Sequence, residues 1–258
     1  MPDTRRHRGS HPKDAGEFSE RQLPTLRDAT GDLAWLLERG YPVKRSTVLV
    51  GDRYALRERQ RKAVGRAAAS GSQVAGRRSR EMEPAELAGR DLWIDGYNVL
   101  LTVEAALGGG VLLDSMDGTL RDIAAMSSHY KRVDETEKAL ELLGAALAEM
   151  APVRVHWLLD RPISNSGRLR ALMLAAAERR GWPWRVELVA NPDAPLKRCT
   201  DPVVTADSAI LDAGPPWLNL ARRVVDASVP GAWRVDLGGV VPLGPEVVET
   251  PGARPRGQ

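Results

Sequence analysis

Three aspartates stand at the points where apolar segments end, and this placement is the first feature of the sequence that points to chemistry. Asp95 closes LWID, Asp160 closes HWLLD, and Asp207 follows two residues after Thr205 in VVTAD. If these segments are parallel strands, their carboxyl ends meet at one edge of a sheet, outside which ligands bind. Clustered carboxylates repel one another, and a hard divalent cation such as Mg²⁺ or Mn²⁺ removes the repulsion. One Asp after a strand is more often a helix cap or turn residue, so only the set of three predicts a metal site.

Further polar residues around these positions could take part in catalysis or hold a phosphate. Asp193, in VANPDAPL after the apolar segment RVELV, is a fourth candidate catalytic acid. Asn98, in DGYNVLL, could hydrogen-bond a phosphate or orient the nearby aspartate, or simply form a turn. Ser164 and Ser166, in DRPISNSG, lead into a predicted helix whose free N–H groups suit an anion. Plain capping explains one of these serines equally well.

Several other classes of site are excluded by the residues present. The single cysteine, Cys199, leaves no disulfide framework and no cysteine-rich zinc site. None of the four histidines has ligand spacing to another, and no GxxxxGK[ST] phosphate loop occurs. A haloacid-dehalogenase phosphatase needs D-x-D where this chain has DGY, and a phosphorylated receiver domain needs a late lysine, whereas none follows Lys197. Phosphatases are therefore the weaker alternative.

The elements that must position these residues alternate along the second part of the chain. Apolar segments at 92–94, 153–159, 185–189 and 202–205 predict strands, and 232–241 predicts a final β segment. Amphipathic patterns at 136–149, 166–180 and 217–225 predict helices. Arg121, in SMDGTLRDIAAM, lies in a long connection that could cover the site, so it is a candidate substrate contact. The alternation predicts an α/β domain with a mostly parallel sheet covered on both faces.

A different organisation is expected before residue 90. Residues 1–20 are polar and predict a disordered tail, and 21–70 predict a small, mainly helical basic domain. Its helices are expected at 23–39 and 56–69, with a short strand or tight connection at 46–54 and with Trp35 and Tyr41 in its core. Residues 71–89 have the composition of a linker, 90–243 form the α/β domain, and 244–258 form a loose tail.

The charge is distributed unevenly between these parts. Residues 1–90 carry 19 Lys and Arg against 12 Asp and Glu, and residues 91–258 carry 18 against 22. A helix that presents Arg57, Arg59, Arg61, Lys62 and Arg66 would bind phosphates without sequence preference, or would be an ordinary solvated face. No apolar run approaches the roughly 20 residues that span a bilayer, and no secretory signal is visible. We expect a cytoplasmic protein without membrane contact.

The motifs together resemble the PIN-like nucleases, particularly the branch called NYN domains. LWIDGYNVLL, HWLLD and VVTADSAI match the first strand, the aspartate that ends the next strand, and the late T-x-D segment of these nucleases. DGTLRD, DRPISNSG and PDAPL match the DG-x-x-RD, D-x-P-x-S-x-SG and PD-x-x-L motifs of one PIN-like family. In that family the domain commonly follows a small domain of unknown function with a DL-x-x-LL-x-RGYP segment, here DLAWLLERGYP.

The resemblance implies a PIN-like three-layer fold and a metal-dependent phosphodiesterase that hydrolyses RNA with Mg²⁺ or Mn²⁺. It assigns Asp95, Asp160 and Asp207 to the metal and Asp193 to the remaining acid. The chain departs from many PIN nucleases in one respect, because Glu104 comes too early to match their glutamate on the helix after the first strand. The substrate would be RNA, including structured RNA such as tRNA. A catalytically inactive module that binds RNA or a protein remains the alternative, and a homo-oligomer is open.

Overall fold

A five-stranded parallel sheet forms the centre of the molecule. The computed structural model describes residues 7–123 and 130–239. The strand order is β5–β4–β1–β6–β7, and all four neighbouring pairs are parallel. The strands are β1 (Asp91–Asp95), β4 (Arg154–Asp160), β5 (Trp184–Val189), β6 (Val203–Val204) and β7 (Trp217–Leu218). The predicted α/β class with a mostly parallel sheet is confirmed.

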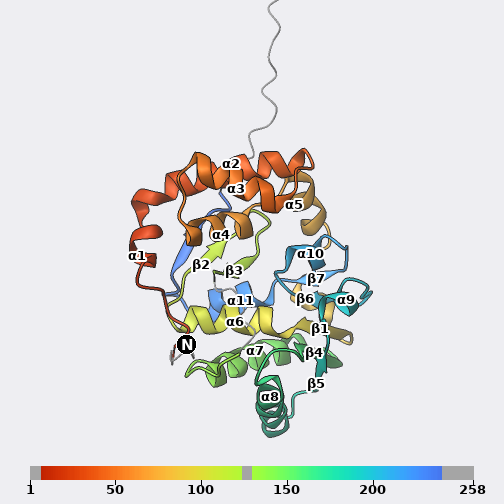
Figure 1. The fold of residues 1–258 in the computed structure, drawn as a ribbon. Helices are drawn as coiled ribbons and strands as arrows, with labels where there is room; N and C mark the ends of the chain where they lie inside the picture. Colours follow the sequence, from red (N-terminus) through yellow and green to blue (C-terminus); the bar gives the residue numbers. More distant parts are fainter. Residues whose placement is uncertain (1–6, 124–129, 240–258) are drawn as a thin grey trace, which may run out of the picture.

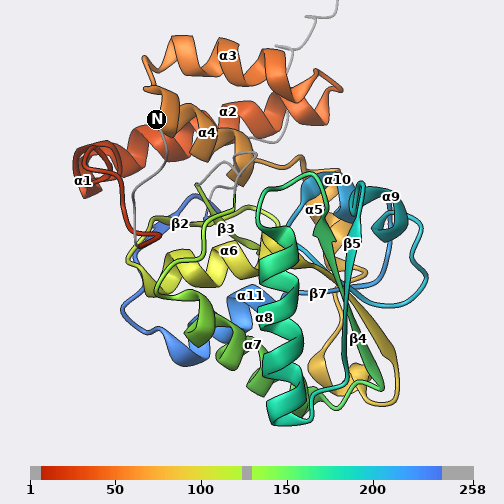
Figure 2. The same cartoon turned by 60° about the horizontal axis from the view of Figure 1, so that its bottom comes forward.

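Helices cover both faces of this sheet. The larger apolar core lies between the sheet and α6 (Gly96–Leu107), α7 (Thr136–Met150), α8 (Ser166–Arg180) and α11 (Leu220–Ser228) (Figures 1 and 2). A smaller core on the opposite face includes Leu158, Leu196 and Ile210, from β4 and from the short helices α9 (Asp193–Leu196) and α10 (Ser208–Leu211). Alternate residues of β4 thus serve the two cores, since Trp157 belongs to the larger and Leu158 to the smaller.

Gly96 allows α6 to begin directly against the neighbouring strand. A Cβ atom at this position would lie 2.6 Å from the side chain of Leu159 and 2.9 Å from the carbonyl oxygen of Leu158. Only glycine tolerates so close an approach. The turn from β1 into α6 therefore places Asp95 at the edge of the sheet with β4 immediately beside it.

A second, three-stranded sheet lies between α6 and the N-terminal helices (Figure 2). Its order is β3 (Leu120–Asp122), β2 (Leu112–Asp114), β8 (Arg234–Asp236), with the first pair antiparallel and the second parallel. Leu113 and Val235 pack in one core with Leu26, Leu33 and Ala63 of the N-terminal helices. The long connection after α6 therefore forms part of this second sheet, which the sequence analysis did not anticipate.

The N-terminal region is helical, as expected, but more of it is structured than the composition suggests. It contains α1 (Asp14–Glu17), the 3₁₀ turn η1 (Glu20–Gln22), α2 (Leu23–Glu38), α3 (Val43–Arg53), α4 (Glu58–Ala67), α5 (Gly71–Arg78) and the 3₁₀ turn η2 (Pro84–Leu87). The prediction of a strand or tight connection at 46–54 is wrong, because these residues lie almost entirely in α3. Residues 7–20, expected to be disordered, bury Asp14 and Phe18.

Other expected boundaries also differ. Residues 71–89, with linker composition, contain α5 and η2. The predicted helix 217–225 is divided into β7 and α11, and the final β segment is limited to β8 among the described residues. Residues 1–6 and 240–258, including the predicted C-terminal tail, lie outside the described part. No helix among the described residues combines the length and apolar character needed to cross a membrane.

Candidate functional site

Four aspartates follow four adjacent strands at the carboxyl edge of the main sheet. The chain passes outward from β1 to β4 and β5, and then returns to β6 on the other side of β1. The strand order therefore reverses at β1, which is where open parallel sheets bind ligands. Asp95 ends β1, Asp160 ends β4, Asp193 begins the short helix after β5, and Asp207 follows β6 by three residues. The structure thus brings all four predicted acids to one edge.

Thr205 links the two aspartates that flank the reversal. Its hydroxyl donates to Oδ2 of Asp95 at 2.9 Å and accepts the backbone N–H of Asp207 at 3.0 Å. Oδ1 of Asp207 in turn accepts the backbone N–H groups of Ala209 and Ile210 at the start of α10. The predicted alternative role of Asp207 as a helix cap is therefore present, and it leaves Oδ2 of the same carboxylate without a hydrogen bond from any described residue.

The charges that most affect the pKa of Asp95 are negative. The pKa of Asp95 is raised to about 7, and burial of the carboxyl group is the largest cause. A hydrogen bond from Thr205 lowers the pKa, whereas the negative charges of Asp207, Asp193 and Asp160 contribute to raising it. Burial and the charge of Asp193 also raise the pKa of Asp160. Lowered pKa values would be expected if basic side chains faced these groups. The edge therefore concentrates negative charge, and of the four aspartates Asp193 has a cationic partner, Lys197.

A hard divalent cation fits this donor set, but not as a ligand of three carboxylates at once. Among residues 7–123 and 130–239, no three His, Cys, Asp or Glu side chains converge closely enough to hold a metal ion. Asp207 is turned toward the N–H groups of α10, and Asp193 toward Lys197 Nζ at 3.0 Å. Mg²⁺ is usually held by one or two carboxylates together with water and phosphate oxygens. Oδ1 of Asp95 and Oδ2 of Asp207, which accept no hydrogen bond in the described part of the chain, fit that mode.

Two predicted substrate contacts instead hold the segment that carries Asp207. Oδ1 of Asn98, in α6, accepts the backbone N–H of Ala206 at 2.8 Å, and Nε of Arg121, in β3, donates to the carbonyl oxygen of Ala206 at 2.8 Å. Arg121 is only 7% exposed. A buried acid of its own turn fixes the guanidinium, so Arg121 supports the segment beside Asp207, and its contact with substrate stays a prediction. Asn98 performs the orienting role that was one of its two predicted alternatives.

That buried acid is Asp117, which joins the site to the N-terminal helices. Both terminal nitrogens of Arg121 and one of Arg77 donate to Asp117, which is fully buried. Arg77, in α5, is 1% exposed and also donates to the carboxylate of Asp212, five residues after Asp207. We call Arg77, Asp117, Arg121 and Asp212 the arginine–aspartate network. The network holds the segment 206–212 at both ends. Arg121 binds the carbonyl oxygen of Ala206, and Arg77, from a helix that precedes the α/β domain, binds Asp212.

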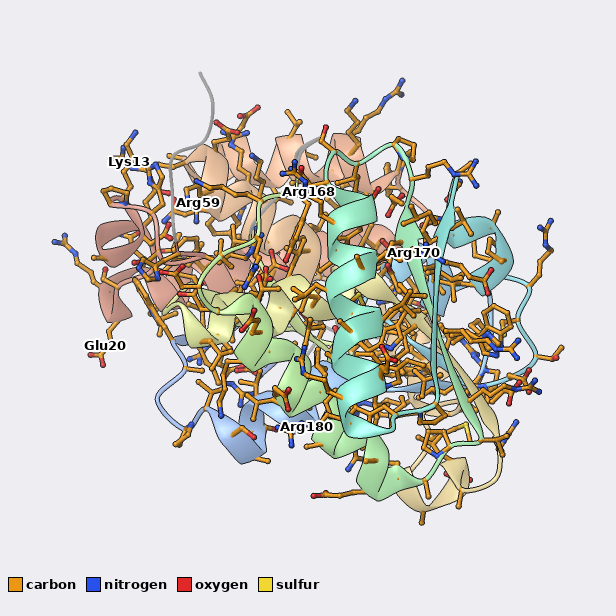
Figure 3. The ribbon with its side chains drawn as sticks, turned by 90° about the horizontal axis from the view of Figure 1, so that it is seen from below. Lys13, Glu20, Arg59, Arg168, Arg170 and Arg180 are labelled. Carbon is orange, nitrogen blue, oxygen red and sulfur yellow. The ribbon has the colours of Figure 1, made fainter. Side chains whose placement is uncertain are left out.

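The predicted serine contacts lie at the start of α8 beside Asp160. Ser164 is exposed in the loop after β4, and its carbonyl oxygen accepts the N–H of Tyr130. Ser166 is buried, and its hydroxyl donates to the carbonyl oxygen of Arg161 at 3.4 Å, so only Ser164 is open to a ligand. Figure 3 shows Arg168 and Arg170 along α8; Nε of Arg170 donates to the Val186 carbonyl of β5. Arg168 is exposed near the first turn.

Two buried residues near this edge were not assigned by the sequence. Tyr97 is fully buried, its hydroxyl has no hydrogen-bond partner in the described structure, and burial together with the charges of Asp160 and Glu104 raises its pKa. Glu104 is fully buried and accepts hydrogen bonds from Arg8, Tyr130 and Thr136. These bonds give Glu104 a structural role. The position of Tyr97 in DGYN was its only signal.

The basic surface predicted on α4 is largely neutralised within the molecule. Four of its five cations form ion pairs: Arg59 with Asp14, Arg61 with Asp52, Lys62 with Glu58, and Arg66 with Asp122. Three of these acids, Asp14, Asp52 and Asp122, lie outside α4, so the sequence of the helix alone overstates its free positive charge. Only Arg57 of the predicted set has no ion pair among the described residues.

Comparisons with known proteins match both parts of the chain. The family model "Domain of unknown function (DUF5616)" matches residues 84–223, and "Protein of unknown function (DUF434)" matches residues 25–80. The chain is also 27% identical over 187 residues to "Uncharacterized protein MJ0935" of Methanocaldococcus jannaschii, over 72% of this chain and 89% of that protein. No solved structure matches the chain.

Proposed function

The chain belongs to the DUF5616 family, and we propose that it is a metal-dependent phosphodiesterase that hydrolyses RNA with Mg²⁺ or Mn²⁺. The observation that carries the proposal is the group of four aspartates at the point where the strand order reverses: burial and then the charges of the other three raise the pKa of Asp95. A divalent cation would remove the mutual repulsion of these carboxylates when they are ionised. The motifs shared with PIN-like nucleases support RNA as the substrate.

In this proposal Asp95, Asp207 and Asp160 would hold the cation, the first two through the carboxylate oxygens that accept no hydrogen bond from the described residues. The cation would supply an activated water and neutralise charge on the phosphate. Thr205 fixes the orientation of Asp95, and α10 fixes that of Asp207. Asp193 would add negative charge that favours cation binding, and Ser164 and the first turn of α8 would hold a phosphate near Asp160.

The test is cleavage of single-stranded and structured RNA by the purified full chain in Mg²⁺, in Mn²⁺ and in EDTA. We expect activity with either metal and none in EDTA. Asp95→Asn and Asp207→Asn should each lower activity by at least about a hundredfold, because both would remove a direct metal contact. Asp28→Asn, which changes an exposed acid of α2, is the matched control and should match the wild type.

Binding of Mn²⁺ is measured as the loss of the electron paramagnetic resonance signal of the free ion. This measurement distinguishes a metal-dependent nuclease from a module that only binds RNA. Equal cleavage by the wild type, Asp95→Asn and Asp207→Asn would refute the mechanism. RNA binding without cleavage and without Mn²⁺ binding would favour the alternative, a catalytically inactive module.

A further inference from the structure

Exposed apolar side chains concentrate on the outermost hairpin of the N-terminal region. Six large apolar side chains are exposed among the described residues, and five lie in α2, in α3 or in the turn between them. On α3 these are Val43, Val48 and Leu49, which are 50%, 54% and 62% exposed. Figure 2 shows α3 on the outer side of α2 and α4, away from the main sheet. Contiguous apolar surface of this kind usually marks an interaction site.

The inner side of α3 already serves the core, so its outer face is available. Ser46, Val50 and Gly51 are buried, and Val50 packs with Leu26 and Leu33 of α2. The exposed residues of the outer face are spaced by four along the helix and form two neighbouring rows. One row consists of Lys44, Val48 and Asp52, and the other of Arg45 and Leu49. This outer face, formed by Lys44, Arg45, Val48, Leu49 and Asp52, is named here the α3 face.

The charges of the α3 face are arranged so that it complements itself. Lys44 and Arg45 lie at its beginning and carry no ion pair among the described residues. Asp52 lies at its end, and its side chain is 67% exposed although it contacts Arg61. When two such helices run antiparallel about a two-fold axis near Val48, Asp52 of each meets the basic pair of the other. The aliphatic side chains then meet at the centre.

We propose that two copies of this chain associate through the α3 face, with their α3 helices antiparallel about a two-fold axis. A two-fold interface requires one patch that is its own complement, and an apolar centre with opposite charges at its ends meets this requirement. RNA fits the face less well, because Val48 and Leu49 offer no ring on which a base could stack. The interface is small, so the dimer dissociates on dilution in the micromolar range. The inference does not depend on the proposed activity.

Sedimentation velocity of the full chain, from low to high micromolar concentration, tests the association. We expect a monomer–dimer equilibrium for the wild type and at least tenfold weaker association for Leu49→Glu. Val153→Glu is the matched control, because Val153 is 53% exposed and lies outside the hairpin. It should dimerise like the wild type. Circular dichroism verifies that each variant is folded, which is expected because both positions are exposed.

A charge exchange tests the antiparallel arrangement itself. Lys44→Glu places two acids opposite each other, Asp52→Lys places basic side chains opposite each other, and each variant alone should associate more weakly than the wild type. An equimolar mixture of the two should recover dimer, because both cross-contacts then pair opposite charges. A wild type that is monomeric throughout, equal effects of Leu49→Glu and Val153→Glu, or no recovery in the mixture would each overturn the proposal.

Discussion

The arginine–aspartate network makes a strong prediction about stability, because its central acid is completely enclosed. Asp117 is 0% exposed and accepts hydrogen bonds from Arg77, from both terminal nitrogens of Arg121, and from the backbone N–H and hydroxyl of Thr119. Burial alone would raise the pKa of Asp117, but the two guanidinium groups outweigh it and hold the pKa far below its usual range. The carboxylate is therefore ionised, and its charge balances two buried cations.

Asp117→Asn keeps the shape of the side chain and removes the charge. Two buried guanidinium groups then face an amide, and loss of one partner of a buried ion pair costs about 3 to 5 kcal/mol. Native proteins of this kind are stable by about 5 to 15 kcal/mol, so the variant should fold with a much reduced margin. Asp212→Asn is the matched control. Asp212 is 34% exposed and leaves Arg77 its contact with Asp117, so its loss should cost about 1 kcal/mol or less.

The assay is urea unfolding at neutral pH, followed by tryptophan fluorescence, with all three proteins analysed by linear extrapolation. A lower midpoint at an unchanged slope is the expected result for Asp117→Asn. The depressed pKa of Asp117 also fixes the direction of a pH effect. Its contribution is complete above its ordinary pKa near 4 and is lost only as the pH falls further toward its folded-state value. If Asp117→Asn costs no more than Asp212→Asn, the network does not hold the structure together as argued.

Two further predictions concern the site and the core. The pKa of Asp95 is raised from 3.8 to about 7, so without metal the free energy of unfolding should fall as the pH rises between about 4 and about 7, by no more than about 4 kcal/mol. Urea unfolding in EDTA should show this fall in the wild type and a smaller one in Asp95→Asn; parallel curves would contradict it. In α7, a Cβ on Gly144 would lie 2.1 Å from the indole of Trp182, so Gly144→Ala should lose about 1 to 2 kcal/mol despite its better helix propensity. Gly76→Ala in α5, where the nearest atom is 3.6 Å away, should gain up to about 1 kcal/mol, and a stabilised Gly144→Ala would refute the packing argument.

The sequence predicted those features of the site that depend on where the strands end. The positions of Asp95 and Asp160 could be predicted because the end of an apolar run marks the end of a strand. Parallel strands end at one edge of the sheet. The orientation of the side chains was not predictable, because it depends on partners distant in the sequence. Asp207 turns toward α10, and Arg121 toward Asp117, and no spacing rule distinguishes an arginine that contacts substrate from one buried against an acid.

In the N-terminal region, tertiary packing determines the structure more than the local sequence pattern does. The run Val48–Val50 has strand-like composition, yet it lies in α3, because Val50 fills a helical core with α2 while Val48 and Leu49 face outward. Propensity is a weak prior that packing overrides. The ion pairs of α4 escaped prediction for a similar reason: Asp14 and Asp122 come from segments that only the tertiary fold brings near.

The two matched family regions form one structural unit, and the network explains why. The N-terminal helices share a core with the second sheet. The carbonyl oxygen of Arg77 accepts the indole N–H of Trp217 in β7, while its guanidinium reaches Asp212 and Asp117. If the α/β domain were separated after residue 89, Asp117 would lose one of its two cations and Asp212 both bonds from Arg77. The segment that carries Asp207 would then be held at one end only. The helices that precede the α/β domain thus take part in positioning the acids of the site, although they contribute none of them.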